Sequence, residues 1–345
     1  MSLYHFPLQR QHFQNGIFYD SVFMPSYADD NETRNAEVVL LTLTTEQNKP
    51  LAEQWRQYLS ALTGVPFETM KIADLGYYVS EENTEDDVVK SFMENLYQYV
   101  QGRLLILTDR PEWISYMARI SEKECRMAIF TSYIKYHGPK NTEHSPDLYA
   151  LVEEKKLVSL SLIGVQNYYL SYEDMRLLQH HKKIDYLRLS GIQDDINEVE
   201  PYVRHAGSVL ILHNSMQTND SPGISPDDMQ KAVYLTALSP FNKQLWIDLN
   251  TPFLNQLSLI AWHYLWGTYN KMEDFPFIER KKLKEIIVKK NNLKKRYFFN
   301  PISGRFWIEE LKKNRSIDGL LPCTEKNYLT FKQNGEALSD DTHLF

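Results

Sequence analysis

Residues 209–223 read V-L-I-L-H-N-S-M-Q-T-N-D-S-P-G, and this stretch decides the fold. It opens with a short apolar run, which is typical of a buried strand. It continues through short polar residues and closes on Ser221, Pro222 and Gly223, a combination that favours a turn. Because the ligands of open α/β sheets bind at the carboxyl ends of strands, we expect a functional site here.

On both sides of this stretch, short apolar segments alternate with segments of helical spacing. The expected strands are 37–44, 67–73, 103–108, 127–132, 157–165, 184–189, 209–212 and 244–249. The expected helices are 47–63, 87–100, 112–120, 171–181, 194–204, 225–238 and 255–269, with Ser171 and Ser225 as N-caps. About eight strands that alternate with helices predict an α/β protein with a three-layer α/β/α core and a mostly parallel sheet.

This core is expected to span residues 37–271, after an irregular N-terminal segment, 1–36, and before a C-terminal extension, 272–345. Within the extension, residues 280–296 carry nine Lys or Arg with apolar residues between them. We interpret this segment as an amphipathic helix with a solvated basic face; the alternative is a patch for a polyanion or an acidic partner. The next residues predict an aromatic β-hairpin around residues 300–304.

Composition limits the function classes. The chain has 345 residues, 24% of them charged and 43% hydrophobic, which is ordinary for a globular protein. Its net charge of −7 makes nucleic-acid binding unexpected. The two cysteines, Cys125 and Cys323, give no disulfide framework and favour a reducing compartment. The sequence shows neither a secretory signal nor a membrane span, so we expect a soluble, cytoplasmic protein without membrane contact.

Several segments resemble the arginase/agmatinase/formimidoylglutamase family, the ureohydrolases. They are I-G-V-Q-N-Y-Y at 163–169, N-D-S-P-G at 219–223 with Ser225 and Pro226 after it, and the expected last core helix, residues 257–270. Residues 303–307, S-G-R-F-W, and 321–328 are similar to the C-terminal extension of a bacterial formimidoylglutamase-like branch. The resemblance implies an arginase-like α/β/α fold with a small C-terminal helix and a β-hairpin.

The resemblance also implies a reaction, the hydrolysis of a C–N bond by hydroxide held between two Mn²⁺ ions. The family takes its metal ligands from three strand ends, as G-G-x-H, D-x-H-x-D and S-x-D-x-D. The corresponding positions here, with the family's acidic substrate-binding position last, are Pro111, Ser132, Ile134, Tyr136, Leu212, Asn214 and Leu249. None of these side chains is a carboxylate or an imidazole, so we expect no manganese and no other cofactor.

Other polar residues near these strand ends are candidates for a pocket. They are Asp109, Glu112, His213, Asp220 and Asp248. His213 alternates with Leu212 and is expected to face away from an inward ligand, as a hydrogen-bonded or surface imidazole. Asp220 is interpreted as a turn-stabilising carboxylate and Asp109 as a helix N-cap. His137 and His144, which flank a loop, are weaker ligand candidates.

Three functions follow from these observations. The favoured one is an arginase-superfamily pseudoenzyme with a degenerate metal site that binds a protein partner, or a small molecule in the vestigial pocket. The second is an active hydrolase of linear amidines, formimidoylglutamase-like or agmatinase-like, with a relocated or single-metal site. The third is a scaffold that self-associates, or binds a protein, through the aromatic C-terminal extension.

Overall fold

A large central sheet organises the chain in the computed structural model. The structure describes residues 4–6, 31–63, 70–80, 86–120, 124–133, 148–219, 221–290, 293–310 and 316–334. In these residues nine strands pair in the order β1-β3-β2-β4-β9-β8-β5-β6-β7, and only β1 runs antiparallel to its neighbour. The strands are β1 (Tyr4–Phe6), β2 (Val38–Thr45), β3 (Ile72–Ser80), β4 (Arg103–Thr108), β5 (Cys125–Phe130), β6 (Leu157–Val165), β7 (Ile184–Arg188), β8 (Ser208–Ile211) and β9 (Gln244–Asp248).

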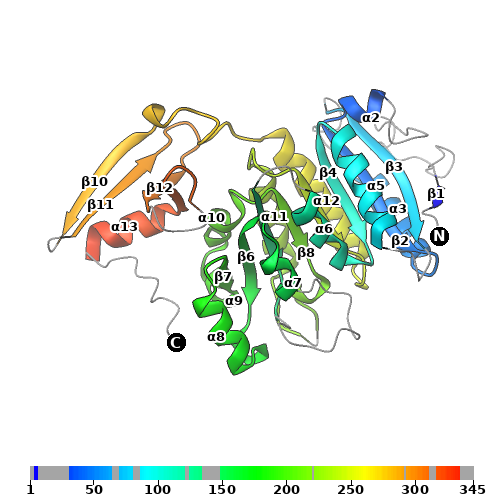
Figure 1. Cartoon of the computed structure of the whole chain (residues 1–345), viewed down its shortest axis with the longest axis horizontal. Coiled ribbons are helices and arrows are strands. Elements are labelled where there is room, and N and C mark those ends of the chain that lie inside the picture. Colours follow the sequence, from blue (N-terminus) through cyan, green and yellow to red (C-terminus); the bar gives the residue numbers. More distant parts are fainter. Residues whose placement is uncertain are drawn as a thin grey trace.

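Helices cover both faces of this sheet, which makes three layers (Figure 1). Successive residues of β2 face opposite sides, so Val38 and Leu40 join one core and Val39 and Leu41 the other. The first face packs against α3 (Lys49–Ser60), α9 (Leu189–Asp194), α10 (Glu200–Val203), α11 (Pro226–Ala237) and α12 (Leu254–Tyr269). The second face packs against α5 (Asp86–Tyr99), α6 (Ser115–Ile120), α7 (Leu148–Glu153) and α8 (Tyr172–His180). The predicted eight-stranded, mostly parallel α/β/α core is confirmed.

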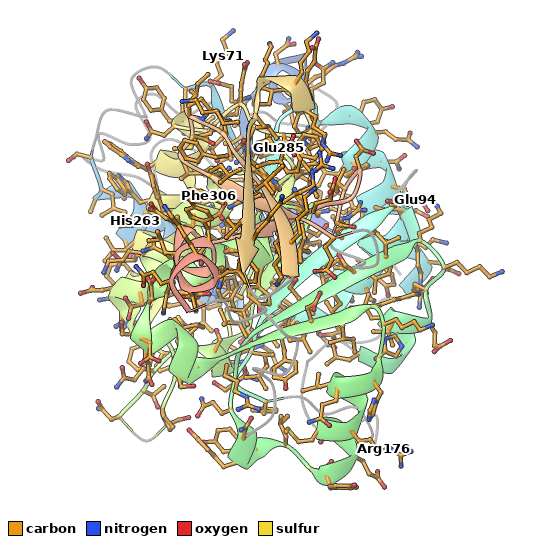
Figure 2. The ribbon with its side chains drawn as sticks, turned by 90° about the vertical axis from the view of Figure 1, so that its left-hand side faces the viewer. Lys71, Glu94, Arg176, His263, Glu285 and Phe306 are labelled. Carbon is orange, nitrogen blue, oxygen red and sulfur yellow. The ribbon has the colours of Figure 1, made fainter. Side chains whose placement is uncertain are left out.

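A second sheet of four antiparallel strands projects beside this core (Figure 1). It consists of β10 (Lys284–Lys290), β11 (Leu293–Phe299), β12 (Phe306–Glu309) and β13 (Leu320–Cys323), and α13 (Glu325–Asn334) follows it. Figure 2 views the molecule from this side and labels Glu285 on β10 and Phe306 on β12. The predicted aromatic hairpin is therefore present as β11 and β12.

The prediction of an amphipathic helix over residues 280–296 is wrong. A short 3-10 turn, η6 (Arg280–Lys282), leads into β10, and β10 pairs with β11 from Lys284↔Phe299 to Lys290↔Leu293. Ile286, Ile287 and Val288 form a β-branched run, which favours a strand. Ile286 and Val288 pack on the cluster that contains Phe331 of α13, whereas Ile287 is 48% exposed. Alternate burial of this kind has the period of a strand and not of a helix.

Local sequence signals explain several element ends. Ser171 accepts a hydrogen bond from the backbone N–H of Asp174 and Ser225 accepts one from Asp228, so both predicted N-caps are confirmed. The strand expected at 67–73 instead begins at Ile72 and continues to Ser80. The helix expected at 194–204 is broken into short pieces, α9, η4 (Ile196–Val199) and α10.

Candidate functional site

The carboxyl ends of four adjacent parallel strands lie level with one another. The pairs Thr108↔Asp248, Ile211↔Ile247 and Phe130↔Ile211 place the ends of β4, β9, β8 and β5 at one edge of the sheet. This edge is where the ligands of open α/β sheets bind. Most sequence-derived site residues follow these strand ends, and they divide into a neutral cluster and an acidic one.

The neutral cluster ties the end of β5 to the end of β8. The side-chain oxygen of Asn214 accepts a hydrogen bond from the backbone N–H of Ser132 (3.2 Å). It also lies 3.1 Å from Thr131 Oγ1, whose single proton has a shorter bond of 2.6 Å to the backbone oxygen of Tyr133. Ser132 Oγ in turn donates to the backbone oxygen of Asn214 over 2.6 Å. From β6, Gln166 Nε2 donates to Ser132 Oγ and to the backbone oxygen of Pro222, each over 2.9 Å. These uncharged groups are linked by hydrogen bonds, whereas Gln166 Oε1 is buried and makes none in the described part of the chain.

Three more of the expected site positions, two for metal and one for substrate, carry buried apolar side chains. Leu212 is 5% exposed and lies in the core under the second face, and Leu249 is fully buried in the core under the first. Pro111 is buried at the start of η2 (Pro111–Ile114). Ile134, Tyr136, Asp220, His137 and His144 lie outside the described residues.

A binuclear manganese centre, the group that this fold family implies, does not fit these residues. Hard divalent ions need several anionic oxygens, but Ser132 and Asn214 are neutral and already hydrogen-bonded to each other. Among the described residues, no three His, Cys, Asp or Glu side chains lie close enough together to share a metal ion.

The acidic cluster is centred on Asp248, at the end of β9. Its carboxylate is 1% exposed, and Oδ2 accepts from the backbone N–H of His213 (3.1 Å) and lies 2.5 Å from His213 Nδ1. Oδ1 accepts from the backbone N–H (2.9 Å) and the side-chain Nδ2 (2.8 Å) of Asn250. Because a carboxylate only accepts, Nδ1 is the donor, and a neutral His213 then carries its acceptor lone pair on Nε2.

The prediction that His213 is hydrogen-bonded or on the surface is confirmed, since the imidazole is bonded and 42% exposed. The expectation that it turns away from the site is wrong. It begins a 3-10 turn, η5 (His213–Ser215), and this turn carries its ring onto Asp248 of the neighbouring strand. Alternation of side chains holds only while a chain stays extended.

Asp109 lies one residue beyond β4 and is 2% exposed. Its Oδ2 accepts from four donors: the backbone N–H and Oγ1 of Thr45, Oγ1 of Thr44 and Nδ2 of Asn48. The N-cap position of η2 belongs to Arg110, so the N-cap interpretation of Asp109 is wrong. Asp109 instead fixes the end of β2 to the end of β4. Within the described residues, its Oδ1 is buried and makes no hydrogen bond.

Asn250, which the sequence reasoning missed, joins the acidic residues. Its Nδ2 donates both to the carboxylate of Asp248 and to the backbone oxygen of Asp109 (3.1 Å). The sequence did contain a signal for this contact. An Asp at the end of a strand, such as Asp248, commonly accepts a hydrogen bond from the backbone N–H two residues later, here that of Asn250. Glu112 is placed apart from this cluster, as an intermediate-exposure residue 3.7 Å from Arg110.

Comparison with known proteins supports the fold. No protein-family model matches the chain, and no curated protein matches its sequence. Solved structures do match: an arginase superfamily protein from Trypanosoma cruzi has a TM-score of 0.59 and 12% identity, over 72% of this chain and 99% of that one. The agmatine ureohydrolase of Thermoplasma volcanium has a TM-score of 0.54 and 13% identity, over 71% and 92%. The formimidoylglutamase of Bacillus subtilis has a TM-score of 0.57 and 13% identity, over 69% and 88%.

The chain therefore has the arginase-superfamily fold, and the resemblance stated from sequence is confirmed at that level. Identities of 12–13% show the fold alone. Among the described helices none is both long and apolar enough to cross a membrane.

Proposed function

We propose that this protein is a pseudoenzyme of the arginase fold, which binds a ligand or partner and does not carry out the metal-dependent hydrolysis. One observation carries the proposal. The strand ends that would hold manganese are tied together by hydrogen bonds between neutral groups, since Asn214 accepts from the backbone N–H of Ser132 and Ser132 Oγ donates to the backbone oxygen of Asn214. These bonds link β5 to β8, which is the structural task that bridging ions would otherwise perform.

The proposed binding region is the carboxyl edge of the sheet, around His213, Asp248 and Asn250. Its imidazole is exposed, whereas the carboxylate behind it is buried and held by four hydrogen-bond contacts. A rigid, partly exposed polar group of this kind suits recognition of a small polar molecule. The small-molecule ligand expected in the vestigial pocket is therefore proposed for this edge.

A second candidate function, C–N hydrolysis of linear amidines by a relocated site, is favoured by the same imidazole. A carboxylate that holds His Nδ1 leaves Nε2 as a base, and such a pair can activate water for attack on an amidine carbon. General-base catalysis of this type contributes roughly 10²–10⁴ in rate. In this candidate His213 removes the proton from water and Asp248 orients the ring.

Metal analysis and an activity assay on the same preparation separate the two functions. The full chain is purified without chelator, its manganese content is measured, and it is assayed on guanidino and formimidoyl substrates. The binding function predicts substoichiometric manganese and no turnover in either the wild type or His213→Ala. Turnover that disappears in His213→Ala establishes the second candidate. Near-stoichiometric manganese together with turnover overturns the pseudoenzyme.

We also propose that a protein partner or a second copy uses the C-terminal extension. The hairpin aromatics that suggested this are internal, since Tyr297, Phe298 and Trp307 are at most 4% exposed. The large apolar side chains that face solvent in the described part of the extension are Ile302 (90% exposed), Phe277 (63%), Ile287 (48%) and Leu329 (38%). Sedimentation of the wild type and of Ile302→Ser tests self-association, and a monomeric wild type refutes it.

The cytoplasm is the compartment we propose. Cys125 and Cys323 are both buried and free, and burial raises the pKa of each thiol to about 12. Thiols held protonated in this way are poorly reactive, which suits a reducing environment without requiring a disulfide. Microscopy of the tagged chain in its own host cell tests this placement.

A further inference from the structure

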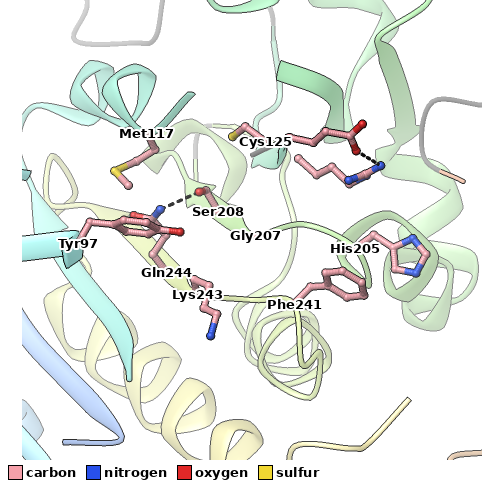
Figure 3. Close-up of a pocket in the computed structure, with 11 residues that line it drawn as sticks. Tyr97, Met117, Cys125, His205, Gly207, Ser208, Phe241, Lys243 and Gln244 are labelled. Carbon is pink, nitrogen blue, oxygen red and sulfur yellow. Dashed lines mark hydrogen bonds and ion pairs between the residues drawn. The ribbon is translucent and has the colours of Figure 1, made fainter. Parts of the chain in front are cut away.

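A cavity lies at the opposite edge of the large sheet, where the strands begin. Its volume is about 730 Å³, and its wall includes Cys125 of β5, Ser208 of β8 and Gln244 of β9 (Figure 3). The candidate site described above lies at the carboxyl ends of these strands, so the two regions are separated by the length of the sheet. A cavity of this size suits a small organic molecule.

The charged groups around this cavity are mostly cationic. Arg126 and Lys243 line it, and among the described residues the only acidic one in its wall is Glu124, whose carboxylate pairs with Arg126 over 2.9 Å. Lys243 is exposed, and no carboxylate of the described residues lies within 4 Å of its ammonium group. In the described part of the chain the buried Nε–H of Arg126 makes no hydrogen bond. The cavity thus carries more positive charge than its own acid balances.

Two further cations reinforce this excess from behind the wall. Arg103 is 6% exposed and donates to the backbone oxygens of Ala237 (2.5 Å) and Ser239 (2.7 Å), which are neutral acceptors. Although Lys243 is exposed as a whole residue, partial desolvation by the surrounding chain, followed by the charges of Arg103 and Lys271, lowers its pKa. An anion placed beside Lys243 would relieve this like-charge repulsion. Such positive potential is local, because the whole chain carries a net charge of −7.

The neutral polar groups of the wall are already engaged. Gln244 Nε2 donates to Ser208 Oγ over 2.8 Å, and its Oε1 accepts from Trp246 Nε1 over 2.9 Å. The remaining lining is apolar or aromatic, and the ring of Phe241 lies 5.0 Å from His205 and 4.9 Å from Phe277.

We propose that this cavity is a binding site for a small organic anion, in which Lys243 holds a carboxylate or phosphate group and Phe241 packs against an apolar body. The site lies where the core meets the segment that leads to the C-terminal sheet, since Phe277 belongs to that segment. This anion site is independent of the proposed function, so an experiment that refutes one leaves the other untouched.

Calorimetric titration of the full chain with three probes of similar shape tests this site. Phenyl phosphate and phenylacetate carry the two candidate anionic groups, and phenylacetamide is the neutral control. At least one anion is expected to bind with a Kd of about 1 mM or tighter, and the amide is not. Binding of one anion without the other supports the site and identifies its group.

Lys243→Gln removes one charge from an exposed side chain, so the variant should fold normally. Loss of a charge-assisted contact is expected to weaken anion binding on the order of tenfold. Lys231→Gln is the matched control, because this side chain is 62% exposed on α11 and does not line the cavity; its affinity should equal that of the wild type. Equal affinities of the two variants, equal binding of the amide, or no binding of either anion would each overturn the proposal.

Discussion

Replacement of Arg305 with methionine tests how the C-terminal sheet is joined to the core. Arg305, 7% exposed, lies 3.0 Å from Glu200 of α10 through Nε and 3.2 Å from Asp274 through Nη1. Glu200 also pairs with Arg204, whose Nη1 donates to the backbone oxygen of Phe306 over 2.6 Å. These buried charges therefore connect a core helix to a strand of the second sheet.

The magnitude follows from what Arg305→Met leaves behind. Removing one partner of a buried ion pair typically costs about 3–5 kcal/mol, because the other charge remains buried. Here Glu200 keeps Arg204, and Asp274 keeps a hydrogen bond of 2.8 Å from Asn300 Nδ2. We therefore expect the low end, about 3 kcal/mol of unfolding free energy.

Urea unfolding of wild type and variant, followed by tryptophan fluorescence, measures this loss. Trp307 is fully buried under the guanidinium of Arg204, 4.7 Å from its ring centre, and reports on this junction. Arg296→Met is the matched control, since Arg296 lies in the same sheet but is 39% exposed and its pairs with Glu285 and Glu309 are screened by solvent. A loss below about 1 kcal/mol for Arg305→Met, or midpoints equal to those of Arg296→Met, would refute the reasoning.

Three further predictions address the core and the candidate site. Burial raises the pKa of Glu200, but the charges of Arg204 and Arg305 outweigh it and hold the pKa below its ordinary 4.5. The stabilisation is therefore present above that value and is lost as the pH falls through the lower folded pKa, so the stability difference between wild type and Glu200→Gln should shrink in acid titrations. Arg56→Met should cost about 3–5 kcal/mol in urea unfolding, because it leaves the fully buried Asp74 without its partner. Gly223→Ala should lower the melting temperature, because the added Cβ would lie 2.5 Å from a backbone atom of Met216. Gly191→Ala should lower it much less, because there the added Cβ would lie 3.2 Å from a side-chain atom of Leu187, which can move.

The sequence predicted the large sheet well, for a simple reason. Strands buried on both faces read as continuous apolar runs, and these runs end where polar residues begin. The expected bounds 103–108 and 157–165 coincide with β4 and β6. The apolar run itself marks such a strand, so its bounds can be predicted without knowledge of the strands that pair with it.

The basic segment was mispredicted because its charges masked a weaker signal. Ile286, Ile287 and Val288 are the residues that favour a strand, but their alternate exposure depends on β11 and α13, which lie later in the chain. Lysines along the outer strand of a small sheet also discourage pairing with another chain, so a high basic charge is compatible with β-structure. The composition of this segment is therefore compatible both with an amphipathic helix and with a solvent-exposed edge strand.

The candidate site was predicted in part. Ser132 and Asn214 were identified as occupants of metal positions, and the structure places them in contact. The contact between His213 and Asp248 was not foreseen, since it joins the ends of two different strands through a 3-10 turn. A short turn after a strand changes which side chains come into contact. The alternation of residues along a single strand does not predict such a turn.

Hydrogen-bond donors of the chain contact most oxygens of the two clusters at this edge, although Asp109 Oδ1 and Gln166 Oε1 are buried and make no hydrogen bond in the described part of the chain. Asp248 accepts from His213 and Asn250, and Oδ2 of Asp109 accepts from four donors. A carboxylate compensated in this way needs no cation to be stable when buried. A metal entering the site would have to displace these donors and bind neutral oxygens at Ser132 and Asn214 as well. The hydrogen bonds of Asp248, Ser132 and Asn214 therefore compete with metal binding, which supports the proposal that this edge binds a ligand without a metal.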